Sequence, residues 1–207
     1  MPGGLDTPRP PALPLPPETY TRASFDRTNN VLRLFFNRLT TTIIDLLNTA
    51  EGGKYLYMPR GVFFSKADQT ASSANTGYPV EFEFTSVSGG ISVGGSDNTR
   101  ITVTANGVYN FQTTLQIEQN DSSAATVWVW ARVDGSDQVY TGHKNTVAGN
   151  TNATVYWNFS LALSASQYVE VYWATSSTQL NLHTEAASTP HPGIPSAAVA
   201  VSFVSNT

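Results

Sequence analysis

Apolar and polar residues alternate along most of the C-terminal three quarters of this sequence. Successive side chains of an extended strand point to opposite faces, so a period of two predicts β-strands with one face in a core. Eight short runs of this kind with no helical pattern between them predict an antiparallel sandwich or barrel. The runs cover residues 55–64, 100–104, 108–117, 126–133, 154–163, 168–173, 179–183 and 197–204.

Small and polar residues separate these runs and mark the expected turns. The clearest is Asp134-Gly135, which lies between two apolar stretches. A two-residue type I′ turn needs positive φ at both central positions, which Asp and Gly tolerate, so this pair predicts a tight hairpin. The other pairs are Gly89-Gly90, Gly94-Gly95, Asn106-Gly107 and Gly149-Asn150.

The segment before the β region is the one convincing helix, over about residues 21–49. Ser24 is the expected N-cap, and the Gly52-Gly53 pair is the expected stop. A seven-residue apolar repeat is typical of a helix that packs against copies of itself or against a long partner. The alternative is a helix that docks on its own β-domain. The residues expected to pack are Phe25, Leu32, Phe35, Phe36, Leu39, Ile43 and Leu46.

Residues 1–20 are rich in proline, which fixes φ and removes a hydrogen-bond donor, so we expect an extended arm. Stiff, alternating leucine and proline side chains offer apolar contacts at little entropic cost, which favours an anchoring role in a partner's groove. A disordered tail is the alternative. The expected anchoring residues are Leu13, Pro14, Leu15, Pro16 and Pro17.

The composition argues against several classes of function. Charged residues make up only 13% of the chain and the net charge is −4, so no basic surface for nucleic acid is expected. The chain has no cysteine, which removes disulfides, thiol nucleophiles and cysteine-ligated metals. No apolar run approaches the roughly 20 residues of a membrane span, and no secretory signal is visible at the N-terminus. We therefore expect no membrane partner.

No arrangement of residues predicts catalysis, a metal or a cofactor, so we expect a protein that is not an enzyme. The three histidines are far apart, with His143 in a polar loop, His183 at a strand end and His191 between two prolines. Glu81 and Glu83 are spaced like a glycosidase carboxylate pair, but their flanking phenylalanines favour the polar side of an alternating strand. A surface Ca²⁺ at Asp134 and Asp137 is the remaining alternative to simple turn formation there.

Several strands carry aromatic residues toward both faces, which is more than a monomeric sandwich with a polar outer face requires. Trp128 and Trp130 share one face of their run, whereas Tyr172 and Trp173 point to opposite faces, as do Tyr156 and Trp157. Either these side chains pack between subunits, or they fill one large core or lie singly exposed. The candidates for an interface between subunits are Trp128, Trp130, Trp157, Tyr172 and Trp173.

The order of these segments resembles a known family. Residues 101–104 (Ile-Thr-Val-Thr) followed by 107–111 (Gly-Val-Tyr-Asn-Phe) resemble the tumour-necrosis-factor and complement-head jelly-roll superfamily. Residues 129–135, the pair 159–163 and 166–171, and the closing run 195–203 are similar to its later strands, so the resemblance covers about 60–207. The long Ser/Thr/Asn-rich loops depart from the family and are like those of bacteriophage structural versions. Residues 13–17 and 32–39 are similar to the opening of short phage virion proteins that carry such a head.

The resemblance implies a homotrimer of jelly rolls with one sheet of each subunit buried around the threefold axis. The expected fold is mostly β: an antiparallel jelly-roll sandwich over 54–207, preceded by a proline-rich anchoring arm over 1–20 and an amphipathic helix with a Gly-rich hinge over 21–53. The expected function is a virion structural protein at the particle surface, a head-decoration, fibre or spike component held to capsid or tail proteins through residues 1–50. The alternative is a receptor-binding module for a host-surface glycan.

Overall fold

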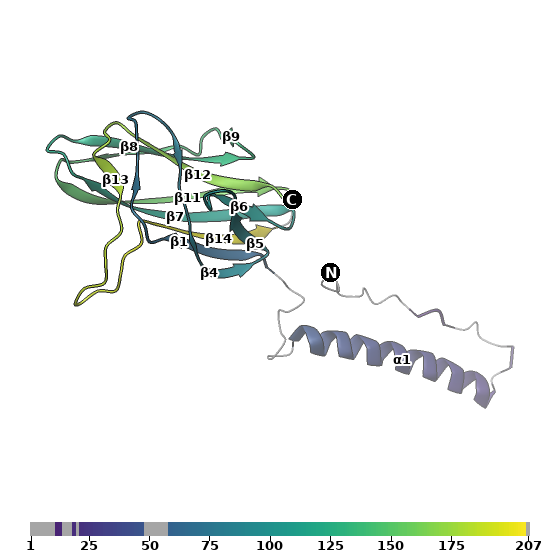
Figure 1. Cartoon of the computed structure of the whole chain (residues 1–207). Helices are drawn as coiled ribbons and strands as arrows, with labels where there is room; N and C mark the ends of the chain where they lie inside the picture. The colour runs from purple at the N-terminus through teal and green to yellow at the C-terminus, as the bar shows by residue number, and fades with distance from the viewer. Residues whose placement is uncertain (1–10, 14–17, 20, 48–57, 206–207) are drawn as a thin grey trace. The chain divides into compact units, whose positions relative to one another are not determined.

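The computed structural model describes residues 11–13, 18–19, 21–47 and 58–205, with the side chains of 44–47 excepted. Its contacts divide the chain into two compact units, Met1–Tyr57 and Met58–Thr207. The first contains one described helix and the second contains antiparallel strands, which make up about half of the chain (Figure 1). The expectation of a mostly β protein with antiparallel sheets and one helix is confirmed.

Helix α1 spans Arg22–Leu47, within the expected range of about 21–49, and begins three residues before the start that Ser24 as N-cap would give. Thr21, not Ser24, is the N-cap: the backbone N–H of Ser24 donates to Thr21 Oγ1 at 3.3 Å, and the N–H of Thr21 donates back to Ser24 Oγ at 3.2 Å. Two orphan donors of the first turn are therefore satisfied reciprocally, as in a capping box. Ser24 serves as the third helical residue of that box. Within the described residues α1 lacks the apolar length needed to cross a membrane.

The first sheet has seven strands among the described residues. Its centre is the long strand β7, which pairs with β11 along one edge and with β14 and then β13 along the other. Beyond β14 follow β1 and β4, and β2 pairs with β13. The bounds are β1 Arg60–Ser65, β2 Gln69–Thr70, β4 Phe84–Gly89, β7 Gly107–Gln119, β11 Thr151–Leu163, β13 Leu180–Leu182 and β14 Ala197–Ser205.

The second sheet also has seven described strands, in the order β10-β8-β12-β6-β5, with β3 beside β12 and β9 beside β8. Four of its strands, β3, β5, β9 and β10, lie outside the expected runs. Strand β10 contains His143, which the sequence placed in a polar loop, and β5 lies between the expected turns at Gly89-Gly90 and Gly94-Gly95. The bounds are β3 Tyr78–Pro79, β5 Ile91–Gly94, β6 Arg100–Val103, β8 Ala125–Val133, β9 Ser136–Asp137, β10 His143–Val147 and β12 Tyr168–Thr175.

One hydrophobic core fills the space between the two sheets. It is built from the inward residues of the alternating strands, such as Tyr109, Phe111 and Leu115 of β7, all fully buried. Phe111 stacks on Phe159 of the neighbouring strand with 4.9 Å between ring centroids and 4° between the planes. Because the polar residues between them point outward, the alternation seen in the sequence defines the two faces of the sheet.

The expected hairpin at Asp134-Gly135 is confirmed. Both residues have positive φ, 47° and 81°, and Val133 pairs with Ser136 across the turn. The Asp134 carboxylate accepts hydrogen bonds from the backbone N–H of Tyr168 and the side chain of Gln167, which join the turn to the start of β12. The aspartate therefore has a structural role in holding this turn.

Candidate functional site

The predicted attachment residues lie in the first unit, and only part of them is described. Leu13 is exposed, and Pro14, Leu15, Pro16 and Pro17 lie outside the described residues. On α1 the seam residues Leu32, Phe35 and Leu39 are half-buried, whereas Phe25, Phe36 and Ile43 are exposed; the side chain of Leu46 is not described. The role of these residues in packing against other chains stays a prediction.

The predicted interface aromatics are divided between the core and the surface. Trp173 is 1% exposed and Trp157 is 8% exposed, so their own subunit encloses both. Trp128, Trp130 and Tyr172 are half-buried on the outer face of the second sheet. Trp157 and Trp173 therefore belong to the single filled core that the sequence left as the alternative, and only the other three are placed where a partner can reach them.

The outer aromatics form an ordered cluster with charged neighbours. The rings of Trp130 and Tyr172 lie 5.6 Å apart on adjacent strands, and the Arg132 guanidinium stands 4.5 Å from the Tyr172 ring centroid. Asp137 accepts a hydrogen bond from Trp130 Nε1 at 2.8 Å and forms a 3.0 Å ion pair with Arg132 Nε. Gly77 packs so closely over Trp130 that a Cβ there would lie 2.9 Å from the indole ring. These contacts hold the cluster in one arrangement.

A loop beside this cluster presents two apolar side chains to solvent. Val139 is 80% exposed and Tyr140 is fully exposed, with a φ of 64° that a tyrosine rarely adopts. Thr141 fixes the loop, since its hydroxyl donates to the Gln138 carbonyl at 2.8 Å and accepts from the Ala131 N–H at 3.1 Å. Tyr140 is thus held in a strained backbone conformation with its side chain exposed.

The outer face of the first sheet is broad and uncharged. Across β11, β7 and β14 the outward residues form rows in register, with Asn158 beside Gln112 and Ala200 in the middle row. The amide of Asn110 donates to Asn158 Oδ1 at 2.6 Å, so part of the face is an amide network. We call this surface the uncharged face; its outward residues are Val62, Phe64, Phe84, Val87, Asn110, Gln112, Thr114, Thr154, Tyr156, Asn158, Ser160, Ala162, Ala198, Ala200, Ser202 and Val204.

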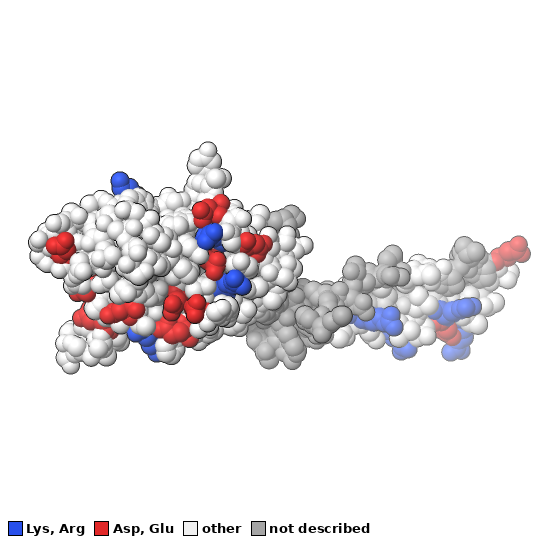
Figure 2. Space-filling model, turned by 45° about the horizontal axis from the view of Figure 1, so that its top comes forward, with Lys and Arg blue, Asp and Glu red and all other residues white. Residues whose placement is uncertain are grey.

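Charges are few over the rest of the surface as well. In the view of Figure 2 uncharged atoms cover most of the β unit, and its acidic groups gather in small clusters. The charged residue nearest the uncharged face is Lys66, whose ammonium lies over the Phe84 ring at one edge; Arg60 at the start of β1 and Glu118 near the end of β7 also point outward close to it. Interfaces between proteins are depleted of charge at their centre, so this face has the composition of one.

Between β13 and β14 the chain leaves the sheets as a narrow two-stranded ribbon, residues 184–194 (Figure 1, yellow-green). Glu185 pairs with Ile194 through two backbone hydrogen bonds of 2.8–2.9 Å, and Ser188 pairs with His191 nearer the tip. Residues 185–190 are exposed. His191 Nε2 lies 3.3 Å from Glu185 Oε1, so the two ionisable groups of the ribbon face each other.

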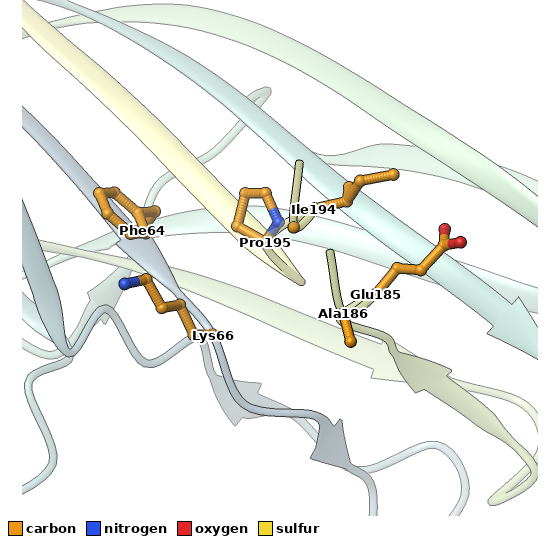
Figure 3. Close-up of a pocket in the computed structure, with 7 residues that line it drawn as sticks. Phe64, Lys66, Glu185, Ala186, Ile194 and Pro195 are labelled. Carbon is orange, nitrogen blue, oxygen red and sulfur yellow. The ribbon is translucent and has the colours of Figure 1, made fainter. Parts of the chain in front are cut away.

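A pocket of about 570 Å³ lies where the ribbon joins the uncharged face (Figure 3). Phe64 and Lys66 approach it from the end of β1, and the base of the ribbon forms the other wall. The Lys66 ammonium stands 3.8 Å from the centroid of the Phe84 ring, and thus takes part in a cation–π contact at the edge of the pocket. The ribbon residues that line it are Glu185, Ala186, Gly193, Ile194 and Pro195.

The carboxylates considered from the sequence have structural partners or lie apart. Glu81 and Glu83 are exposed between β3 and β4, outside the strands, while Val80 and Phe82 point into the core. Glu83 accepts a hydrogen bond from the backbone N–H of Lys66. Burial, then the charges of Asp97 and Glu83, raise the pKa of Glu81 above its ordinary value. This arrangement gives no acid and nucleophile facing a common cleft.

Two tyrosines have shifted pKa values for local reasons. The pKa of Tyr78 is lowered, chiefly by its hydrogen bond with Ser72, and the hydroxyl also accepts the N–H of Ser73 at 2.9 Å. Burial raises the pKa of Tyr109, whose hydroxyl donates to the Ala105 carbonyl. Each tyrosine thereby fastens a loop to the sandwich.

The described residues contain no group of three metal-ligating side chains suited to an ion. His183 comes closest to such a group, with Nδ1 3.2 Å from Asp68 Oδ1 and 3.5 Å from Glu118 Oε2. Asp68 also accepts the backbone N–H of Thr184, the first residue of the ribbon. These contacts fix the root of the ribbon to the sheet.

Sequence reasoning did not single out the ribbon, the pocket or the apolar part of the uncharged face. The ribbon sequence, with prolines at 190 and 192, lacks alternation and gives no strand signal. A partial signal exists at Phe63 and Phe64: adjacent aromatics in a strand must point to opposite faces, so one of them has to lie outside the core.

These features define a mostly β protein with two antiparallel sheets around one core and a separate N-terminal unit that contains one helix. A scan against protein-family models matches no family, and a search of curated proteins finds no significant relative.

Proposed function

We propose that this chain is a virion structural protein, a trimeric jelly roll at the particle surface that residues 1–50 attach to capsid or tail proteins. The observation that carries the proposal is the uncharged face: its outward residues on β11, β7 and β14 include no charged side chain, and Lys66 lies only over its Phe84 edge. A surface of this composition buries no charged group at its centre when it meets a second copy, and no like charges oppose each other there.

The strand order supports the assignment of a jelly roll. The main strands form one sheet in the order β1-β14-β7-β11 and the other in the order β6-β12-β8-β10. Apart from β8 and β10, which follow each other in the chain and pair in one sheet, successive main strands alternate between the sheets, and most neighbours within a sheet are distant in sequence, as in a fold made of two Greek keys. The resemblance of residues 60–207 to the trimeric tumour-necrosis-factor and complement-head superfamily points the same way.

The helical unit supports attachment. Phe36 and Ile43 are 57% and 44% exposed on α1, and apolar side chains on one helix gain stability when a partner covers them. Three parallel copies of a helix with a seven-residue apolar repeat would cover this seam, and the preceding proline-rich segment would be free to bind the particle. The proposed location is the virion, because an N-terminal extension of this kind can hold a trimer on the surface of a particle.

The first experiment measures the mass of the full chain in dilute solution. We expect three times the 22.3 kDa of one chain. A second sample lacks residues 1–50 and is tested for binding to particles that lack the protein. We expect it to keep its β-sheet circular dichroism and to lose binding, while the full chain binds. A monomer in solution and on the particle would refute the proposal, and binding by the shortened chain would refute attachment through residues 1–50.

A receptor-binding role is the second candidate, and the Val139–Tyr140 loop favours it. Tyrosine displayed on a rigid loop among uncharged hydrogen-bonding residues can stack on the apolar side of a sugar ring while its neighbours bind hydroxyl groups. A glycan array probed with the chain and with the Tyr140→Ala variant tests this role. Binding that the variant loses supports it, and an array with no specific signal contradicts it.

A further inference from the structure

The outer edge of β11 is the longest unprotected strand edge in the described part of the chain. Each of its 13 residues, Thr151–Leu163, pairs with β7 on one side without interruption. On the other side the described strands provide no backbone partner. Its unpaired N–H and C=O groups therefore offer a ready template for a further strand.

Proteins normally protect such an edge with charged side chains, proline or a bulge. The segment 151–163 has none of these: it contains no charged residue and no proline, and its register with β7 is regular. Beside the edge the sandwich is incompletely closed, since Phe159 and Leu161 point toward the core and remain half-buried. A covering partner would both satisfy the backbone groups and bury these side chains.

The 184–194 ribbon also lacks a surface to pack on over much of its length. A two-stranded ribbon is marginally stable in water without a surface to pack on, yet residues 185–190 are exposed. Its two ionisable groups, Glu185 and His191, face each other at 3.3 Å. The rest of the ribbon consists of alanine, serine, threonine, proline, glycine and isoleucine. Apart from Glu185 and His191 the ribbon therefore presents an uncharged surface, as does the edge of β11.

The ribbon leaves the sandwich beside the uncharged face. Phe64, whose ring belongs to that face, forms one wall of the pocket whose other wall is the ribbon base (Figure 3). A molecule seated on the uncharged face would therefore also contact the ribbon and fill the pocket. This continuity connects the ribbon to the self-association proposed above.

We propose that the ribbon of one copy lies along the free β11 edge of a second copy. The inference rests on the proposed trimer and names the contact that closes it. Ribbon and edge are different surfaces, so each copy gives its ribbon to one neighbour and receives the ribbon of the other. A head-to-tail contact of this kind forms a closed ring when the rotation between copies is one third of a turn.

The available area agrees with a stable contact. With strands about 4.8 Å apart and residues rising about 3.3 Å, five strands over eight residues cover roughly 24 by 26 Å, on the order of 600 Å². A standard interface buries about 800 Å² on each partner. The uncharged face alone falls short of this area, so a stable contact needs a further surface, which the ribbon on the β11 edge would add.

The chain contains no cysteine, so disulfide trapping tests the contact without background. Ala186→Cys and Ser188→Cys on the ribbon are combined in turn with Tyr156→Cys, Asn158→Cys and Ser160→Cys on β11, in the full chain under mild oxidation. We expect at least one combination to give covalently linked products up to three chains. The control joins each ribbon cysteine with Ser92→Cys, an exposed position on β5 of the other sheet, and should give no such ladder.

The outcomes separate this inference from the proposed function. A native trimer in which no ribbon–β11 combination cross-links overturns the ribbon contact and leaves the trimer standing. A chain that is monomeric by mass overturns both. A ladder of equal yield from the Ser92 control overturns the ribbon contact, because it indicates random collisions.

A second variant tests the contribution of the ribbon to assembly. Replacing residues 187–192 by Asn-Gly keeps the Glu185–Ile194 pairing and closes it with a type I′ turn. We expect the chain concentration at half-dissociation of the trimer to rise at least tenfold, with the β-sheet circular dichroism unchanged. An unchanged concentration would show that the ribbon does not take part in assembly.

Discussion

The aromatic ring of Phe64 on β1 stacks on that of Phe84 on β4, with 5.6 Å between centroids and 9° between planes. The stack lies outside the core, on the uncharged face, and Lys66 places its ammonium over the Phe84 ring. An aromatic pair of this kind stabilises the folded chain beyond the area that each ring buries. It also leaves Phe84 41% exposed and available to a neighbour.

A double-mutant cycle measures that stack. We expect Phe64→Ala and Phe84→Ala together to lower the free energy of unfolding by about 1 kcal/mol less than the sum of the single changes, because the second substitution removes no further stacking. Urea unfolding at one fixed chain concentration gives the values. Additive single effects would mean that the two rings contribute independently.

A new charge at the centre of the uncharged face should weaken the contact between subunits. Ala200 is half-buried on β14 and points out of the sheet, so Ala200→Arg adds a long cation without disturbing the core. We expect dissociation of the trimer into folded monomers, because an unpaired charge would be buried in each contact. Sedimentation velocity reports the change. Ser92→Arg on the second sheet is the control and should remain trimeric; a trimeric Ala200→Arg variant contradicts the use of this face.

We expect truncation of Trp173 and of Trp128 to lower the free energy of unfolding by different amounts, although both belong to alternating aromatic runs. Trp173 is enclosed in the core, so Trp173→Ala should lower the free energy of unfolding by about 3–5 kcal/mol. Trp128 is half-buried on the outer face, and Trp128→Ala should cost the monomer less than half as much. Denaturant unfolding of the two variants compares them. Equal losses would show that Trp128 is as important to the fold as a core residue.

The sequence predicted the strands well where alternation was strong. All eight expected runs correspond to strands, and the Asp134-Gly135 turn lies where it was expected. The strands β2, β3, β4, β5, β9 and β10 lie outside the expected runs, because two to six residues with little alternation give a weak periodic signal.

Which face of a strand lies in the core was harder to predict than the strand itself. Tyr172 and Trp173 are both aromatic and adjacent, so the pattern fixes that they point apart and leaves open which one points inward. Register decides this, and a shift of one residue exchanges the two faces. For the same reason the sequence placed Trp157 and Trp173 among interface candidates, although the sandwich encloses both.

The N-cap of α1 gives a prediction about the helical unit alone. Thr21→Ala removes the side-chain acceptor for the Ser24 N–H and should destabilise the helix by about 1 kcal/mol. We expect a lower helical signal at 222 nm in the full chain. Thr21→Asp restores an acceptor and adds a favourable charge at the N-terminus, so it should recover the signal. The same loss of helical signal in both variants would show that the Thr21 side chain is not the N-cap of α1.

We expect neutralisation of Glu81 and neutralisation of Glu83 to change the stability of the folded chain in opposite directions at pH 7. The pKa of Glu81 is raised in the folded chain by burial and by the nearby charges of Asp97 and Glu83, so folding favours the protonated form. Its contribution to stability is complete below the unfolded pKa and is lost as pH rises through the higher folded pKa. At pH 7 Glu81→Gln should therefore stabilise the chain, and the difference should vanish near pH 4. The gain is at most about 0.5 kcal/mol, because solvent screens an exposed carboxylate.

Glu83 lies two residues away and is the matched control. Its carboxylate accepts the backbone N–H of Lys66, and a hydrogen bond to an ionised acceptor is stronger than one to a neutral amide. Glu83→Gln should therefore lower the melting temperature at pH 7, in contrast to Glu81→Gln. Differential scanning calorimetry of both variants at pH 4 and pH 7 decides the matter. If both substitutions raise the melting temperature at pH 7, mutual repulsion of the acidic groups outweighs the hydrogen bond to Lys66, and the link between this segment and the end of β1 contributes less than its geometry indicates.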